Sequence, residues 1–164
     1  MEKAVFLDRD GVINLDSGYV GKIKEFEFLP GVFSALKKIQ DAGYRIIIIT
    51  NQSGIARGFY SKKDFLELTK WMMDEFKKKR ITIDQVYFCP HSPKDRCKCR
   101  KPLPNMLRRA IKDFNLEEGR SWIIGDKMSD MEMGKKSYCK KILVGPQRKF
   151  KDLRMVAQFI LNST

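Results

Sequence analysis

The sequence predicts an α/β fold: a doubly wound, mainly parallel, Rossmann-like sheet in a single domain spanning residues 1–164. Short apolar runs that indicate buried parallel strands alternate with longer segments whose apolar residues recur at helical spacing. The apolar runs are residues 4–7, 46–50, 86–89, 122–125 and 142–144. Strands alternating with helices are typical of right-handed crossovers, which build this sheet. A chain of 164 residues suffices for one such domain but not for two ordinary ones.

Four segments show apolar residues at helical spacing and would cover the faces of the sheet. The first ends at Gly43, and Ser61 with Asp64 three residues later predicts a capping box at the start of the second. Pro102 and Pro104 introduce the third. The apolar residues are, in chain order, Val32, Phe33, Leu36 and Ile39; Phe65, Leu68, Met72 and Phe76; Leu107, Ala110, Ile111 and Phe114; and Leu153, Val156, Phe159 and Ile160.

Composition places the chain among soluble globular proteins, because 43% of its residues are hydrophobic and 32% are charged. The first residues contain no apolar stretch of signal-peptide length, so we expect a cytoplasmic protein without a membrane partner. A net charge of +13 favours anionic partners but does not distinguish a phosphorylated metabolite from nucleic acid or an anionic membrane. Much of this charge lies in residues 77–80, 135–136 and 140–141, which we expect at helix ends and neighbouring loops.

Polar side chains follow three of the predicted strands, at the edge where parallel sheets place their sites. Asp8 and Asp10 come after the first strand, Thr50 ends the second and Asp126 follows the fourth. Asp8, Asp10 and Asp126 form an oxygen-rich set suited to Mg²⁺, which also bridges to a substrate phosphate. A carboxylate shielded in this way can attack phosphorus. Alternatively, each aspartate merely caps a helix or forms a turn.

Further residues near this edge carry groups that bind phosphate. Residues 50–54 offer hydroxyl, amide and glycine backbone donors, and Lys101 would supply a point charge for a phosphoryl group. Arg100 would grip a second anionic or hydroxyl-rich part of a substrate, although both bases also fit an ordinary surface. Asp130 either orients Lys127 or a metal-bound water, or caps the short helix that follows.

Three cysteines and the single histidine of the chain lie within eleven residues. Cys89, His91, Cys97 and Cys99 would form a closed tetrahedral set for structural Zn²⁺, which would fix the segment that follows at the reaction centre. The alternatives are buried small residues or a disulfide. Cys139 lies far along the chain from these residues and is expected to be an ordinary buried or free thiol.

Four motifs resemble those of the haloacid dehalogenase superfamily of phosphotransferases: FLDRDGVIN at residues 6–14, IITN ending at Asn51, Lys101, and GDKMSD at residues 125–130. The resemblance implies that Asp8 is the nucleophile and that Asp10 protonates the leaving oxygen and later activates water. It implies that Thr50 and Lys101 hold the phosphoryl group. Mg²⁺ would be bound by Asp8, Asp126 and the backbone carbonyl of Asp10. The fold implied is the haloacid dehalogenase fold without a separate cap domain.

Within the superfamily, the cysteine cluster with TNQSGIARG at residues 50–58 and CRKP at residues 99–102 is similar to the D-glycero-D-manno-heptose 1,7-bisphosphate 7-phosphatases. The resemblance covers nearly the whole chain. It implies a small phosphorylated sugar as substrate, and a place in the synthesis of ADP- or GDP-heptose, precursors of lipopolysaccharide or capsule. The substrate contacts it implies are Asp16, Ser17, Gly18, Tyr19, Asn51, Gln52, Ser53, Arg100 and Lys127.

Three alternatives differ in substrate or class. The short loop at residues 92–96 is similar to that of histidinol-phosphate phosphatases, but Ser53 stands where those enzymes typically carry aspartate. Polynucleotide 3'-phosphatases share the TNQ segment but lack the cysteine cluster. A zinc-stabilised anion-binding module without activity would leave Asp8, Asp10 and Asp126 as a repulsive patch facing a polyanion. We therefore expect no nucleic-acid partner, and a monomer, since no unexplained apolar stripe is visible.

Overall fold

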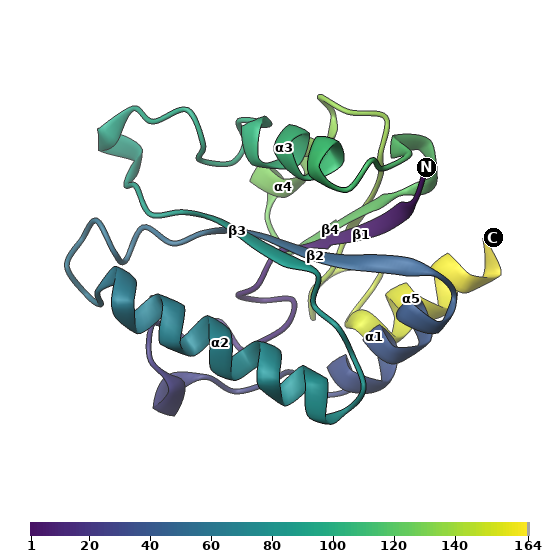
Figure 1. The fold of residues 1–164 in the computed structure, drawn as a ribbon, viewed down its shortest axis with the longest axis horizontal. Helices are drawn as coiled ribbons and strands as arrows, with labels where there is room; N and C mark the ends of the chain where they lie inside the picture. The colour runs from purple at the N-terminus through teal and green to yellow at the C-terminus, as the bar shows by residue number, and fades with distance from the viewer. Residues whose placement is uncertain (164) are drawn as a thin grey trace.

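The computed structural model describes residues 1–163 and contains one five-stranded parallel sheet (Figure 1). The strands are β1 (Lys3–Leu7), β2 (Tyr44–Asn51), β3 (Gln85–Cys89), β4 (Trp122–Gly125) and β5 (Lys140–Leu143), and they lie in the order β3-β2-β1-β4-β5. Every neighbouring pair runs parallel. The predicted doubly wound α/β architecture is therefore confirmed, and each predicted strand is present.

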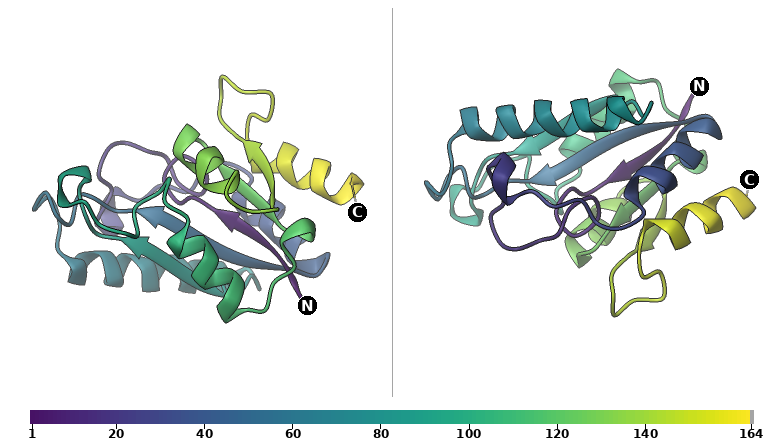
Figure 2. Two further views of the ribbon diagram at one scale, coloured as in Figure 1. Left: turned by 90° about the horizontal axis from the view of Figure 1, so that it is seen from above. Right: turned by 90° about the horizontal axis from the view of Figure 1, so that it is seen from below.

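Helices cover both faces of the sheet. They are α1 (Val32–Asp41), α2 (Lys62–Lys78), α3 (Asn105–Asp113), α4 (Met128–Gly134) and α5 (Leu153–Asn162), with 3-10 turns at Ile23–Glu25, Pro93–Asp95 and Glu118–Arg120. One face carries α1, α2 and α5, whereas α3 and α4 lie on the other (Figure 1). Seen from below, α1 lies between the long α2 and the C-terminal α5 (Figure 2). Among residues 1–163, no helix combines the length and apolar character needed to cross a membrane.

Alternation along the strands divides the core into two clusters. In β1, Val5 and Leu7 pack into the cluster beneath α1, α2 and α5, whereas Ala4 and Phe6 pack into the cluster beneath α3 and α4. Successive side chains of a strand point to opposite faces, so a buried strand needs apolar residues at every position. This explains why the strands are continuous apolar runs in the sequence.

The strand order reverses at β1. The chain moves from β1 to β2 and β3 on one side, and then returns to place β4 and β5 on the other. In open parallel sheets, the crevice at such a reversal lies beyond the carboxyl ends of the strands and holds the ligand. Here it lies between the ends of β1 and β4, where Asp8 and Asp126 follow directly.

Of two predictions about the ends of helices and strands, one is confirmed and one is wrong. The Ser61–Asp64 capping box forms at the start of α2 with both hydrogen bonds at 3.0 Å. Lys140 and Lys141, however, do not lie in a loop beside a helix end, because they begin β5. That prediction was wrong because β5 is an edge strand, which exposes its first two side chains, and charged residues keep such an edge from pairing with another chain.

We expect Phe76→Ala to lower the free energy of unfolding by about 3–5 kcal/mol, because it removes a fully buried ring. Phe76 contacts the rings of Phe28 and Phe33 at centroid distances of 5.4 and 5.2 Å. Urea unfolding measures the loss. Leu66→Ala is the control on the same helix, since Leu66 is 48% exposed, and its cost should stay near zero. Equal losses in the two variants would contradict this account of the core.

Candidate active site

Lys101 lies at the centre of the carboxyl-terminal edge of the sheet with its ammonium group buried. Its Nζ donates to the carbonyl oxygen of Ile49 at 2.7 Å and to Asp130 Oδ1 at 2.7 Å, and it lies 3.1 Å from Asp8 Oδ1. Burial disfavours the charged amine, but the carboxylates of Asp8 and Asp130 outweigh it and raise the pKa of Lys101 above its usual range. The site therefore contains a fixed buried cation.

Asp8 is also buried, yet it stays ionised. Burial alone would raise its pKa, but the positive charges of Lys101 and Lys127 outweigh burial and hold the pKa of Asp8 below its usual range. Lys127 Nζ lies 3.7 Å from Asp8 Oδ2 and 3.3 Å from Asp126 Oδ1. A carboxylate that is ionised, fixed in place and flanked by cations is the form that a nucleophile for phosphorus needs.

The Asp8, Asp126 and Asp130 carboxylates form a group in which one oxygen of each lies within 4.8 Å of the others. Burial and the negative charge of Asp8 raise the pKa of Asp126 to about 6, although the nearby Lys127 acts in the opposite direction. Oxygen donors in this arrangement fit a hard divalent ion such as Mg²⁺. The group includes Asp130, which the predicted Mg²⁺ set did not contain.

Gly11 allows Asp126 to approach the end of β1. The residue has φ +87°, and a Cβ atom on it would lie 2.0 Å from Asp126 Oδ2. Only glycine satisfies both the left-handed backbone and this close contact. The glycine that follows Asp8 and Asp10 in the motif therefore positions a carboxylate from another strand.

The Asp10 carboxylate faces a different set of partners. It accepts hydrogen bonds from Arg9 Nη2 and Asn14 Nδ2, both at 2.9 Å, and from Gln52 Nε2 at 3.1 Å. Gln52 Nε2 also donates to the buried Thr50 hydroxyl at 2.9 Å. The role of the Asp10 backbone carbonyl as a metal ligand stays a prediction.

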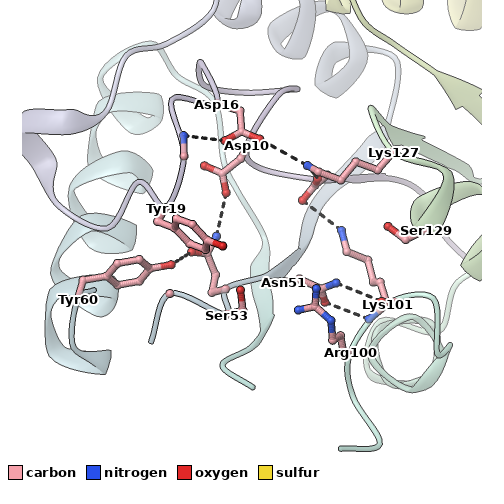
Figure 3. A pocket seen from close by; sticks show the side chains of 14 residues that line it. Asp10, Asp16, Tyr19, Asn51, Ser53, Tyr60, Arg100, Lys101, Lys127 and Ser129 are labelled. Carbon is pink, nitrogen blue, oxygen red and sulfur yellow. Dashed lines mark hydrogen bonds and ion pairs between the residues drawn. The ribbon is translucent and has the colours of Figure 1, made fainter. Parts of the chain in front are cut away.

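These side chains open into a cavity of about 360 Å³ at the end of the sheet. Tyr19 and Tyr60 lie on one side of it, and Lys101 and Lys127 on the other (Figure 3). The cavity is lined by eleven of the predicted site residues, Asp8, Asp10, Asp16, Gly18, Tyr19, Asn51, Gln52, Ser53, Arg100, Lys101 and Lys127, together with Gly54, Tyr60 and Ser129. Apart from the four predicted zinc ligands, three predicted site residues do not line it: Ser17 is exposed, Thr50 is fully buried at the end of β2, and Asp126 lies next to Asp8.

Asn51 joins the end of β2 to the segment that carries Lys101. Its Oδ1 accepts a hydrogen bond from the Lys101 backbone N–H at 3.0 Å, and its Nδ2 donates to the Lys101 carbonyl at 3.2 Å. The side chain of Asn51 thus pairs with the backbone of Lys101 as a neighbouring strand would, and it aligns an irregular segment with the sheet. Asn51 therefore has a structural role in addition to lining the cavity.

The predicted cysteine and histidine residues come together at the end of β3. Cys89 Sγ lies 3.6 Å from Cys97 Sγ and 3.5 Å from His91 Nδ1, and His91 Nδ1 lies 3.3 Å from Cys99 Sγ. Around a tetrahedral Zn²⁺ with bonds of about 2.3 Å to sulfur and about 2.0 Å to nitrogen, two sulfur ligands lie about 3.8 Å apart. A sulfur and a nitrogen ligand lie about 3.5 Å apart. The distances to His91 and between Cys89 and Cys97 lie within about 0.2 Å of these values, whereas the 2.8 Å between Cys89 Sγ and Cys99 Sγ is about 1 Å shorter.

All four cysteines are free thiols, so the disulfide alternative is wrong. Burial acts against ionisation of Cys97, but backbone N–H groups of Arg100 and Cys99 outweigh it and lower its pKa to about 7. A thiol that ionises near neutral pH is suited to binding a metal. Cys139 is a buried free thiol outside this group, as predicted.

Two features of the site were not predicted from the sequence, namely the contact of Asp130 with Lys101 and the burial of Arg9. Asp130 caps α4, accepting from the Lys127 backbone N–H at 3.3 Å, but it also binds Lys101. Arg9 is buried between the rings of Phe26 and Phe65, although an arginine between two aspartates would ordinarily lie in solvent. The only sequence signal for the role of Asp130 was its spacing from Asp126 in GDKMSD. No sequence signal indicated that Arg9 is buried.

Residues 16–144 match the family of haloacid dehalogenase-like hydrolases. The chain therefore belongs to the haloacid dehalogenase-like hydrolases and is a phosphatase of that family. Among solved structures, it is similar to the D,D-heptose 1,7-bisphosphate phosphatase from B. bronchiseptica complexed with magnesium and phosphate. The two are 30% identical with a TM-score of 0.89, and the match covers 99% of each chain.

Curated relatives carry names of the same kind. The chain is 40% identical to D-glycero-beta-D-manno-heptose-1,7-bisphosphate 7-phosphatase of Pasteurella multocida, over 99% of this chain and 93% of the relative. It is 44% identical to D-glycero-alpha-D-manno-heptose-1,7-bisphosphate 7-phosphatase of Campylobacter jejuni, over 96% and 95%. The names differ in the anomer of the sugar. The resemblance recognised in the motifs is thus confirmed over nearly the whole chain.

We expect Gly11→Ala to cost clearly more stability than Gly58→Ala. Both glycines have left-handed φ angles, +87° and +76°, so each variant incurs the backbone cost of about 1–2 kcal/mol. Only at Gly11 does the new methyl group collide with Asp126, whereas nothing lies within 4 Å of it at Gly58. Urea unfolding and phosphatase turnover are measured for both. If the two variants lose equal stability and equal turnover, Gly11 does not position Asp126.

Proposed function

We propose that the protein hydrolyses the 7-phosphate of D-glycero-D-manno-heptose 1,7-bisphosphate in the synthesis of nucleotide-activated heptose. The observation that carries this proposal is the agreement of the curated relatives, 40–47% identical, on this substrate. The cavity supports it, because a phosphoryl site at Asp8 with the cations Lys101 and Lys127 is combined with a further cation at Arg100. A substrate with two phosphates needs two separate cationic regions.

In the proposed reaction, Asp8 attacks the 7-phosphorus and forms an aspartyl phosphate. Lys101 holds a phosphoryl oxygen from the protein interior, and the Thr50 hydroxyl donates to another. Asp10 gives its proton to the leaving sugar oxygen, and then takes a proton from the water that attacks the aspartyl phosphate. One carboxyl group serves as acid and then as base, so the cycle ends with free phosphate and the original protonation states.

The Asp8, Asp126 and Asp130 group fits a bound Mg²⁺, with Asp8 and Asp126 as the side-chain ligands proposed and Asp130 holding Lys101. The ion would neutralise negative charge between Asp8 and the incoming phosphate. Arg100 would bind the second phosphate, and Lys127 would contact the substrate beside Asp8. Asp16, Ser17, Gly18 and Tyr19 would contact the sugar together with Asn51 and Ser53. These residues form or adjoin the mouth of the cavity.

We expect Asp8→Asn to lower turnover at least about a thousandfold, because the amide is not a nucleophile. Phosphate release is measured with Mg²⁺ from both anomers of heptose 1,7-bisphosphate, from histidinol phosphate and from a 3'-phosphorylated oligonucleotide. Asp74→Asn, an exposed site on α2, is the matched control and should keep full turnover. Preference for histidinol phosphate or the oligonucleotide would contradict the proposed substrate. Phosphate release that persists in Asp8→Asn would contradict the role of Asp8 as nucleophile.

We further propose that Cys89, His91, Cys97 and Cys99 bind a structural Zn²⁺. Since every ligand position is filled by the protein, the ion would stabilise the loop rather than meet substrate. Removal of the metal by a chelator, or Cys97→Ser, should lower the melting temperature and the bound zinc measured by elemental analysis. Cys139→Ser is the control and should keep its zinc. A metal-free protein with unchanged melting temperature and activity would contradict the proposal.

A further inference from the structure

The Gln52 side chain is almost fully buried, with 2% exposure, and all its polar atoms have partners inside the protein. Its Nε2 donates to Asp10 Oδ2 at 3.1 Å and to Thr50 Oγ1 at 2.9 Å, and its Oε1 accepts from the Tyr60 hydroxyl. An amide with both N–H groups and its oxygen in use has little capacity left for a ligand. The contacts indicate a role toward Asp10 rather than toward substrate.

Tyr60 determines which end of this amide faces Asp10. The two ends of a glutamine side chain have nearly the same shape, so an external donor or acceptor must distinguish them. Burial raises the pKa of Tyr60 to about 12, so the phenol keeps its proton at neutral pH and donates it to Gln52 Oε1. The Nε2 end is thereby directed at the Asp10 carboxylate. The reversed amide would place a carbonyl oxygen against that carboxylate.

The ring of Tyr60 is held in this position by two glycines on different loops. A Cβ atom on Gly21 would lie 2.0 Å from the ring, and one on Gly54 would lie 2.2 Å from it. The backbone therefore packs directly against the ring, which is 6% exposed and lines the cavity beside Asp10. Figure 3 shows Tyr60 on the same side of the cavity as Tyr19, across from Lys101.

We infer that Tyr60 and Gln52 are positioning residues, which hold the Asp10 carboxyl group where it transfers a proton to the leaving oxygen. This inference rests on the proposed function of Asp10 as acid and base. Tyr60 acts only through Gln52, and Gln52 acts through its hydrogen bond to Asp10. The Thr50 hydroxyl is the second acceptor that fixes the amide plane.

The test compares two leaving groups. The sugar oxygen of heptose 1,7-bisphosphate leaves as an alkoxide and needs a proton, whereas p-nitrophenolate leaves without one. For each substrate, kcat/KM depends only on the steps up to and including the phosphorylation of Asp8. We expect Tyr60→Phe to lower kcat/KM about tenfold on the bisphosphate and less than about twofold on p-nitrophenyl phosphate, as for partial loss of a positioned acid.

A matched control and a double variant sharpen the result. Tyr87→Phe also removes a hydrogen bond donated by a tyrosine hydroxyl, here to Asp113 Oδ2 at 2.7 Å. Tyr87 does not line the cavity, so kcat/KM should stay unchanged on both substrates. Adding Tyr60→Phe to Gln52→Leu should give no further loss, because the two residues act in series. Thermal unfolding of each variant shows that the fold is kept.

Three outcomes would overturn the inference. They are an equal fall on both substrates, a higher KM with unchanged kcat, and losses that add in the double variant. Failure of the proposed function is separate, because it is seen in the unmodified protein. If that protein prefers another alkyl phosphate of the panel, the same comparison is made with that ester, and the two conclusions stand or fall independently.

Discussion

The site depends on one positive charge buried at the carboxyl end of the sheet. Removing an ammonium ion from water costs several kcal/mol, and Lys101 recovers this through two carboxylates and a strand carbonyl. In return, it keeps Asp8 ionised in a place where burial alone would protonate it. Asp8 and Lys101 therefore stabilise each other, and Asp130 fixes Lys101 through a second hydrogen bond from its ammonium group.

Lys101 is placed by a segment that has no regular secondary structure of its own. Cys99 precedes it by two residues and belongs to the cysteine and histidine cluster, while Asn51 pairs with both backbone groups of Lys101. The segment is thus fixed at two points, one on the loop and one on β2. A rigid supporting structure of this kind holds a reacting group more accurately than a free loop does.

The sequence was sufficient to predict features that depend on short-range patterns. The apolar runs predicted the strands, and residues placed directly after them, such as Asp8 and Asp126, converge because parallel strands end at one edge. Contacts between distant segments have no such periodicity. The pairing of Asp130 with Lys101 and the burial of Arg9 depend on tertiary packing, which composition and spacing do not encode. Side-chain orientation at Gln52 is equally invisible in a sequence.

The alternation of side chains along β1 makes the site more sensitive to changes of length than to changes of identity. Losing one residue within Lys3–Leu7 would exchange the side chains that face the two core clusters, and would turn Asp8 away from Lys101. Conservative core substitutions have no such effect. Insertions and deletions are therefore compatible with catalysis mainly between the strands. The geometry of the site is inherited through the number of residues in each strand as much as through the residues themselves.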